Sequence, residues 1–403
     1  MTQAPDITLE AVGSVGAIAA ADWDACARAA LTPPTACASE AAPTAYNPFL
    51  SHAFFSALEQ SKSASPRTGW GARHLVAKQA DRVIGIVPCY LKSHSQGEYV
   101  FDRGWADAYE RAGGNYYPKL QVSVPFTPAT GPRLLIRDGE DCATVAGALT
   151  TGLTALCQMS EASSVHVTFA RQSEWQFLAE QGFLQRTDQQ FHWHNAGYAS
   201  FDEFLGSLNS RHRKAIKRER RDAVANGITI HHLTGPDITE DAWDAFFEFY
   251  METGSRKWGR PYLNREFYSL IGESMSQDVL LVMAKREGRW IAGAINFIGG
   301  DTLFGRHWGA VEQHPFLHFE VCYYQAIDFA ISRGLKVVEA GAQGEHKIAR
   351  GYLPQTTYSA HYIADPALRR AIADYLKRER MYVDEMGREL TEAGPFRKDA
   401  DPA

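Results

Sequence analysis

The segment GAQGEHKIARGYLP (341–354) places an acid, an imidazole and two cations between glycines, directly after the apolar run LKVVEA (335–340). A carboxylate or an imidazole can take a proton from an attacking amine, and cations can hold a phosphate or a carboxylate. The sequence therefore predicts that Glu345 acts as general base or binds the amine, with His346 as the alternative. A solvated loop in which Glu345 pairs with Arg350 is the structural alternative. The predicted substrate contacts in this segment are Gln343, Lys347 and Arg350.

Acyl transfer to an amine suits these residue types. The amine must lose a proton, the tetrahedral oxyanion needs hydrogen-bond donors, and the two substrates must be held together. The sequence has no GxSxG, Walker A or HExxH motif, which favours direct transfer without a covalent enzyme intermediate.

Two stretches before this segment carry further candidates for the same pocket. The motif RHWGA (306–310) follows the strand-like run DTLFG, and its Arg306 can complete the wall of a substrate pocket. The stretch LHFEVCYYQAIDFAISRG (317–334) is typical of a helix that ends at a glycine. Glu320 and Tyr324 share one face of this helix at i, i+4 spacing, where they either line the pocket or face solvent.

The run SRHRKAIKRERR (210–221) is the densest cationic stretch of a chain whose formal net charge is −6. On a helix these cations occupy two adjoining faces, and Ala215 and Ile216 remain available for packing. A polyanion such as a tRNA acceptor stem would bind here, and a solvated surface helix is the alternative. The predicted polyanion contacts are Arg211, Arg213, Lys214, Lys217, Arg218 and Arg221.

A long irregular stretch, GGNYYPKLQVSVPFTPATGPR (113–133), separates predicted strands in the first half of the chain. Loops of this length in compact domains are often functional, so its side chains either bind the acceptor or pack as a rigid connection. The candidates are Tyr116, Tyr117, Lys119 and Arg133. No metal site is predicted, because HWH (192–194) and HH (231–232) lack a third ligand at suitable spacing.

Three blocks of sequence recur in the same order, which predicts a tandem duplication. Each copy reads as hairpin, long loop, helix, strand, short helix and strand, so the expected fold class is mixed α/β (α+β). The copies meet near 195–200, which predicts a first domain at 1–196 and a second at 197–403. The matching blocks are 74–91 with 280–298, 143–170 with 317–340, and 171–193 with 342–362.

The two copies differ where the glycine-flanked segment lies. The first copy keeps an acid, Glu174, in the place of Glu345. It then has Trp175 and Gln176 where the second copy has an imidazole and a cation. The second domain, with a C-terminal helix, is therefore predicted to be the catalytic or donor-binding lobe, and the first to be the acceptor-binding lobe.

Composition and termini indicate an ordinary globular chain. Hydrophobic residues make up 45% and charged residues 22% of the sequence, which excludes a disordered or fibrous protein. The N-terminal stretch lacks a basic region, so no secretory signal is predicted. The sequence has no uninterrupted apolar run of about 18 residues, which argues against a membrane span. We expect a cytoplasmic protein.

Five long motifs carry a family resemblance: FGRHWGA, LHFEVCYYQAIDFAI, EAGAQGEHKIARGYLP, YYPKLQVSVPFTPATGPRLL and SLNSRHRKAIKRERR. They resemble the FemAB-like group of the GNAT (acyl-CoA N-acyltransferase-like) superfamily, usually labelled as peptidoglycan biosynthesis or recognition proteins. The resemblance implies two GNAT-type domains in tandem. It also implies transfer of an amino acid from aminoacyl-tRNA to an amine on a peptidoglycan precursor, as in the Fem aminoacyltransferases.

The resemblance leaves three functions open. The first is this acyl or aminoacyl transfer, and the second is an ordinary acyl-CoA-dependent N-acetyltransferase. Acetyl-CoA enzymes carry R/Q-x-x-G-x-G/A to bind pyrophosphate; Arg306 and Gly309 fit this pattern, but Val311 stands where Gly or Ala is expected. The third is a non-catalytic protein that recognises cell-wall precursors or RNA. No cofactor is expected to stay bound, and the donor is either aminoacyl-tRNA or acyl-CoA.

Overall fold

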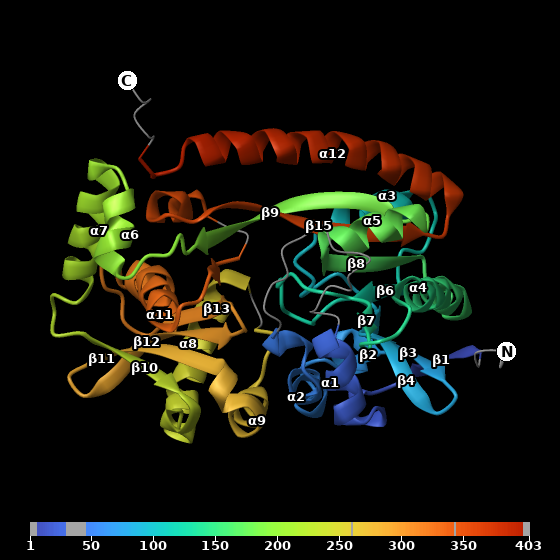
Figure 1. The fold of residues 1–403 in the computed structure, drawn as a ribbon, viewed down its shortest axis with the longest axis horizontal. Coiled ribbons are helices and arrows are strands. Elements are labelled where there is room, and N and C mark those ends of the chain that lie inside the picture. Colours follow the sequence, from blue (N-terminus) through green and yellow to red (C-terminus); the bar gives the residue numbers. More distant parts are fainter. Residues whose placement is uncertain (1–5, 30–45, 259–260, 342–343, 398–403) are drawn as a thin grey trace. The chain divides into compact units, whose positions relative to one another are not determined.

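The computed structural model describes residues 6–29, 46–258, 261–341 and 344–397 (Figure 1). The chain divides into two compact units. Unit 1 is formed by Met1–Asp188 and Thr357–Val383, and unit 2 by Gln189–Thr356 and Asp384–Ala403. Each unit has its own buried core.

Unit 1 is built on two groups of strands. Its elements are β1 (Ile7–Val12), α1 (Ala20–Ala29), α2 (His52–Gln60), β2 (Trp70–Ala72), β3 (His74–Gln79), β4 (Arg82–Val87), β5 (Cys89–Lys92), α3 (Arg103–Arg111), β6 (Lys119–Val122), β7 (Leu135–Ile136), α4 (Cys142–Met159), β8 (Ser164–Ala170), α5 (Gln172–Glu180) and the start of β9 (Leu184–His194), and, after the chain returns, parts of β15 (Leu353–Ile363) and α12 (Pro366–Glu392). Strands β1, β3, β4 and β7 pair antiparallel in that order. The second group runs β2, β5, β6, β8 and β15, with β6 and β8 parallel.

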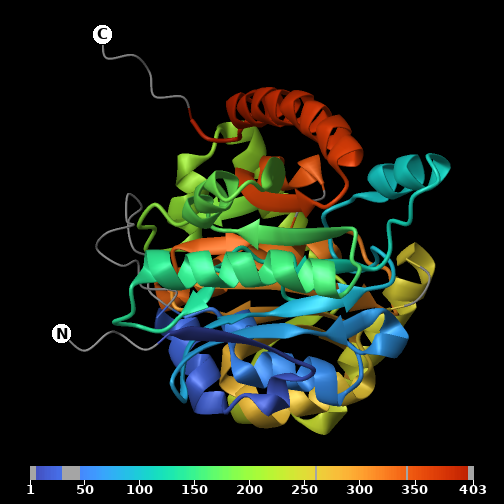
Figure 2. The same cartoon turned by 90° about the vertical axis from the view of Figure 1, so that its right-hand side faces the viewer.

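Helix α4 covers the strands of unit 1 because its apolar residues meet those of β3, β4 and β8 (Figure 2). A Cβ at position 85 would lie 2.8 Å from Val145 and 3.1 Å from Leu149, so Gly85 lets the helix approach the sheet. Among the described residues, α4 alone is long and apolar enough to cross a membrane, and 44% of it is buried in this core. Packing against the sheet accounts for its apolar composition.

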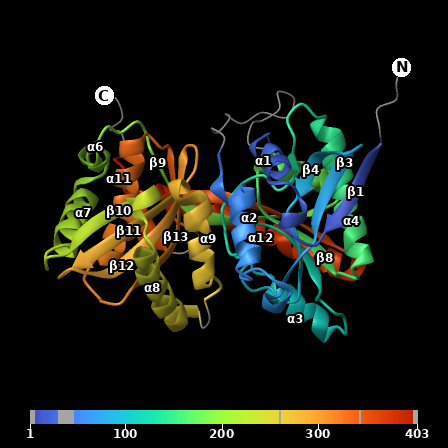
Figure 3. The same cartoon turned by 90° about the horizontal axis from the view of Figure 1, so that it is seen from below.

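Unit 2 repeats the order of hairpin, helix, strand, short helix and strand found in unit 1. Its elements are α6 (Phe201–Ser207), α7 (Ser210–Ala223), β10 (Thr229–Thr234), α8 (Glu240–Trp258), α9 (Arg265–Met275), β11 (Val279–Arg286), β12 (Arg289–Ile298), β13 (Thr302–Ala310), α10 (Leu317–Phe319), the π-helical turn η6 (Glu320–Tyr324), α11 (Gln325–Arg333), β14 (Val337–Glu339), the 3-10 helix η7 (Glu345–Arg350) and the start of β15. Strands β10 to β13 pair antiparallel, β14 lies parallel to β13, and β9 lies antiparallel to β14. Helices α8 and α9 lie side by side, and α8 packs against β12 and β13 (Figure 3).

The repeated order of hairpin, helix, strand, short helix and strand agrees with the predicted duplication. Both hairpins close in tight turns, and the second, Glu287–Gly288, has positive φ at both residues (49° and 78°). The mixed α/β fold class is thereby confirmed.

The last strand of each copy joins the strands of the other unit, which corrects the predicted boundary at 196/197. Residues His192–His194 of β9 pair with β14 inside unit 2. Residues Tyr358–Ile363 of β15 pair with β8 inside unit 1. A sequence repeat shows the order of elements along the chain but not which strands pair. The sequence could therefore not reveal that the last strands are exchanged.

Candidate active site

Strands β13 and β14 begin side by side and then part. Residues Thr302–Phe304 pair in parallel with Val337–Glu339. After this point β13 continues to Ala310, while the chain after β14 turns toward η7. A register shift in the β12–β13 ladder makes Arg306 the extra residue of a β-bulge, where it is half-buried. Bulges frequently re-aim a side chain next to an active site, so Arg306 stays a substrate-binding candidate.

A pocket of about 400 Å³ lies at the end of β13 and the start of the following helix. Its lining residues are Thr253, Trp308, Ala310, Glu312, Gln313, His314, Leu317 and His318. Gly309, the neighbour of two lining residues, is required for packing. A Cβ there would lie 2.0 Å from the carbonyl oxygen of Phe249, so the glycine lets α8 pack on β13.

The pocket contains one carboxylate, that of Glu312. His314 Nε2 lies 2.8 Å from it, and Arg286 donates to it at 3.0 Å. These hydrogen bonds lower the pKa of Glu312, with the His314 contact as the largest cause. The carboxylate is therefore ionised at neutral pH and forms an ion pair with the guanidinium of Arg286.

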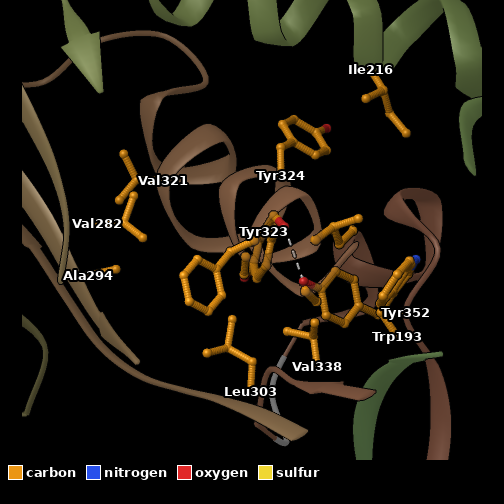
Figure 4. Close-up of a cluster of buried hydrophobic side chains, with 14 of the residues drawn as sticks. Trp193, Ile216, Val282, Ala294, Leu303, Val321, Tyr323, Tyr324, Val338 and Tyr352 are labelled. Carbon is orange, nitrogen blue, oxygen red and sulfur yellow. Dashed lines mark hydrogen bonds between the residues drawn. The ribbon is translucent and has the colours of Figure 1, made fainter. Parts of the chain in front are cut away.

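The helix after the pocket contains a π-helical turn, η6, which is a feature often found at functional sites. The turn places Tyr323 and Tyr324 in succession over the core of unit 2, above Leu303 and Val338 (Figure 4). The Tyr352 hydroxyl donates to the carbonyl oxygen of Tyr323 at 3.3 Å and so fixes the turn. The hydroxyls of the two tyrosines then reach different partners.

His346 is the predicted acid–base group that the structure brings to the pocket. Its Nε2 lies 3.0 Å from the hydroxyl of Tyr323, and its side chain is exposed. Its ring centroid is 5.6 Å from that of Phe319 and 6.3 Å from that of His318, and of these residues His318 lines the pocket. A histidine held by a tyrosine at the edge of a pocket can take up and release a proton.

Lys347 and Arg350, predicted to bind substrate, are buried and hold η7 in place. Lys347 Nζ donates to the carbonyl oxygens of Ala340 and Gly341, the latter at 3.2 Å. Burial lowers the pKa of Lys347 to about 8. Arg350 donates to both carboxylate oxygens of Glu219 at 2.8 and 3.0 Å, and to the carbonyl oxygen of His346 at 2.6 Å. Lys347 thus holds the backbone before η7, and Arg350 holds the backbone of His346, in both cases by hydrogen bonds to carbonyl oxygens.

Glu320 and Tyr324, also predicted to line the pocket, face helix α7 instead. Glu320 is buried and accepts from Arg220 at 3.0 Å. The hydroxyl of Tyr324 donates to Glu219, the same carboxylate that binds Arg350. The sequence did not reveal Glu219 and Arg220 as structural partners, because both lie in a run that looks solvated. The available signal was a single acid one turn after Ile216, which is buried in the core.

Two predicted residues cannot be placed. Gln343 lies outside the described residues, and of Glu345 only the backbone, at the start of η7, is described. Their roles stay predictions. Tyr323 and the pocket residue His318 were not among the predicted site residues, and the adjacent tyrosines YY (323–324) were the available signal.

Helix α7 presents most of its predicted polyanion contacts to solvent. Arg211, Lys214 and Arg218 are exposed, and Arg213 is half-buried. Lys217 lies 3.0 Å from Asp202, and Arg221 lies 2.8 Å from Asp222; these pairs are largely exposed and weak. The buried side of the helix consists of Ile216, Glu219 and Ala223.

The candidates from 113–133 serve mainly inside unit 1. Arg133 is buried and donates to four backbone carbonyls, including those of Ala129 and Thr168 at 2.7 and 2.8 Å. Tyr116 and Lys119 are buried, and both contact the carboxylate of Asp102. Tyr117 is half-buried, with its hydroxyl 2.8 Å from Ser95 Oγ. The contacts of these four residues therefore lie within unit 1, as expected for a packed connection, and their part in acceptor binding stays a prediction.

Glu174, the first-copy counterpart of Glu345, is half-buried in the same region. It accepts from the backbone N–H groups of Arg133 and Leu134, each at 2.8 Å. Burial raises its pKa in spite of these bonds. The acid retained in the first copy therefore holds a loop, and its substitution would disturb unit 1.

Comparisons with known proteins agree with this architecture. The family model FemAB-like, described as peptidoglycan biosynthesis/recognition, matches residues 14–398. A crystal structure of FemX aligns over 88% of this chain and 98% of its own, with 12% identity and a TM-score of 0.52. A tandem GNAT protein from the clavulanic acid biosynthesis pathway, without AcCoA, covers 90% of this chain and 99% of its own, with 13% identity and a TM-score of 0.46. No curated protein matches the sequence. The chain belongs to the FemAB-like family.

Proposed function

We propose that the protein transfers an acyl or aminoacyl group to an amine, and that the reaction takes place in unit 2 beside the β13 pocket. The observation that carries this proposal is the Tyr323–His346 pair, which is held at 3.0 Å beside a pocket at the point where two parallel strands part. The family description supports an amine on a peptidoglycan precursor as the acceptor. The proposed location is the cytoplasm.

In the proposed reaction the amine nitrogen attacks the acyl carbonyl carbon. A carbon–nitrogen bond forms, the bond to the oxygen or sulfur of the donor breaks, and the amine loses a proton. Glu345 remains the first candidate to take that proton or bind the amine, with His346 as the alternative. The Tyr323 hydroxyl orients the His346 ring, and Arg306 is proposed to stabilise negative charge on the donor side.

The proposed donor is an aminoacyl ester such as aminoacyl-tRNA, with an acyl-CoA as the second candidate. Two observations favour this order. Gly309, which fits the acetyl-CoA pattern, is needed for packing against Phe249. Glu312, which directly follows this pattern, places a carboxylate rather than a phosphate-binding group on the wall of the pocket, with Arg286 and His314 as its partners.

The test is a donor screen followed by two substitutions. The full-length protein is incubated with charged tRNA or with CoA thioesters and with amine acceptors, and product is followed by mass spectrometry. Glu345→Gln and His346→Gln are then compared at saturating donor. Removal of the general base is expected to lower turnover by about 10²- to 10⁴-fold, whereas removal of the other group is expected to have the smaller effect.

His231→Gln is the matched control. His231 lies on β10 and contacts Thr229 outside the pocket, so its substitution is expected to leave turnover unchanged. If neither donor class gives product, or if both site variants retain full turnover, the transferase proposal fails. A recognition protein without chemistry would then be the better assignment.

A further inference from the structure

A second group of charged side chains is buried in unit 1, far along the chain from the proposed active site. It lies on one face of the strands β5, β6, β8 and β15. Lys92 pairs across strands with Lys119, and His166 pairs with His361. All four side chains are at most 2% exposed. Buried lysines are rare unless partners compensate their charge.

The partners come from a single covering segment, residues 93–113, which includes α3. Glu98 accepts from Lys119 at 2.7 Å and lies 3.8 Å from Lys92 Nζ. Asp102 accepts from Lys119 and from the Tyr116 hydroxyl. Figure 2 shows α3 standing out from the strands of unit 1 at the end of this segment. The segment therefore places two carboxylates on a cationic surface of the sheet.

The cover fits this surface incompletely. One oxygen of Glu98 and one of Asp102 are buried without a hydrogen-bond partner among the described residues. Beneath them, Gln121 Oε1 and His361 Nε2 also lack partners there. Tyr99 in the cover adopts φ 61°, a left-handed conformation that is strained for a tyrosine. Buried polar atoms without partners weaken the closed arrangement relative to one that would satisfy them.

The cover is also held by two contacts with the strands beneath it. Trp105 packs its ring against that of His361, and Arg186 donates to the carbonyl oxygen of Phe101 at 2.8 Å. The segment ends at Gly113, whose φ of 86° gives the backbone a conformation favourable to glycine. Burial lowers the pKa of Lys92 to about 7 and raises the pKa of Glu98 to about 7, in spite of the nearby opposite charges.

We propose that Glu98 and Asp102 stand in for an anionic ligand, and that a phosphate-bearing or dicarboxylate ligand displaces segment 93–113 and binds Lys92 and Lys119. The groups that remain on the sheet after displacement include two ammonium groups and the imidazoles of His166 and His361. A phosphate or a dicarboxylate offers acceptor oxygens to the same two ammonium groups that Glu98 and Asp102 contact in the closed arrangement. This site is separate from the proposed chemistry in unit 2.

The experiment uses the full-length protein with inorganic phosphate, and with succinate to distinguish phosphate from dicarboxylate. Affinity is measured by calorimetry, and amide hydrogen exchange is followed in peptides from 93–113. Glu98→Gln keeps the side-chain shape but removes the competing charge. We expect it to bind the anion at least about tenfold more tightly and to exchange faster in 93–113, because the competing charge-assisted hydrogen bond is removed. Lys92→Gln is expected to weaken binding.

Asp107→Asn is the matched control, because Asp107 is an exposed acid on α3. It removes the same charge from the same segment and should leave affinity unchanged. Exchange in peptides from 210–223 separates anion binding at α7 from binding under the cover. If neither anion binds Glu98→Gln more tightly than the unmodified protein, Glu98 is a structural residue only and the proposal is overturned.

Discussion

A single carboxylate, that of Glu219, connects the cationic helix α7 to the segment that carries His346. It accepts two hydrogen bonds from Arg350 and one from Tyr324, and Arg350 in turn binds the carbonyl oxygen of His346. Glu219 is 9% exposed, so these partners rather than solvent satisfy most of its hydrogen-bonding capacity. It is a positioning residue for the proposed acid–base group, because it acts through Arg350 rather than on the substrate.

Glu219→Ala is expected to lower the free energy of unfolding by about 3–5 kcal/mol, because it leaves the buried guanidinium of Arg350 without its counter-charge. Denaturant unfolding measures this change. Asp222→Ala on the same helix is the control and should change stability by no more than about 0.5 kcal/mol, since Asp222 pairs with the exposed Arg221. Equal destabilisation in the two variants would show that the Glu219 contacts do not stabilise the fold.

Lys347 gives unit 2 a distinctive dependence on pH. Its pKa is about 8 in the folded chain and takes the usual value of 10.5 when unfolded. Between these values the unfolded chain holds more protons, so stability rises with pH, by at most about 1.4 kcal/mol per pH unit. The unfolding free energy of the native protein, measured relative to that of Lys347→Met, should therefore rise from pH 8 to pH 10. Parallel stability curves for the two proteins would contradict the burial of a charged lysine.

At the residue scale the sequence predicted residue types well and burial poorly. It identified His346, which the structure brings to the pocket. It also assigned substrate contacts to Arg133, Glu320 and Arg350, whose hydrogen bonds in the structure go to backbone carbonyls or to side chains of opposite charge. A charged side chain in a motif looks the same whether its partner is a ligand or a distant residue, because the partner is set by tertiary contacts.

At the scale of elements, helix α7 has one side that packs on unit 2 and one side that carries exposed cations. Ile216, Glu219 and Ala223 attach it to unit 2, while Arg211, Lys214 and Arg218 are exposed. The sequence predicted a helix here with apolar residues available for packing. The structure adds that Glu219 lies on the inward-facing side. The cationic side stays a predicted polyanion surface.

The triple variant Arg211→Gln, Lys214→Gln, Arg218→Gln is expected to weaken binding of unfractionated tRNA, used as a polyanion probe. The slope of log affinity against log salt should fall by about one for each phosphate-binding cation that is removed. Arg220→Gln is the control: it faces Glu320 and Asp328, so it should lower stability without changing the salt slope. A triple variant that binds as tightly as the native protein would exclude this surface.

Hairpins, helix α4 and the helix after β13 could all be anticipated from periodicity and turn residues. The π-helical turn and the β-bulge at Arg306 could not, because each depends on which neighbours pack beside it. These two irregularities surround the proposed active site. At these two places the backbone departs from regular helix and strand geometry. Sequence rules for regular elements therefore do not predict it.

At the scale of the whole molecule, the exchanged strands decide how the chain can be divided. A fragment ending at residue 196 keeps β9 but lacks β15 and the start of α12. It therefore loses the partner strand of β8, and it loses Ile363, Leu368 and Ile372 from a buried cluster of unit 1. We expect this fragment to aggregate or to remain unfolded by circular dichroism, whereas adding 197–403 as a separate chain should restore solubility. A monomeric, cooperatively folded 1–196 fragment would contradict the exchange.

The exchanged strands also bear on how the chain arose. A single ancestral copy would have ended in one free strand, with a matching open edge on its own sheet. Two such molecules could trade their last strands and form a symmetric dimer, which is a low-cost route to association. Fusion of the two genes would then have made that dimer permanent within one polypeptide. The two copies, no longer required to be identical, were free to specialise, and only the second acquired His346.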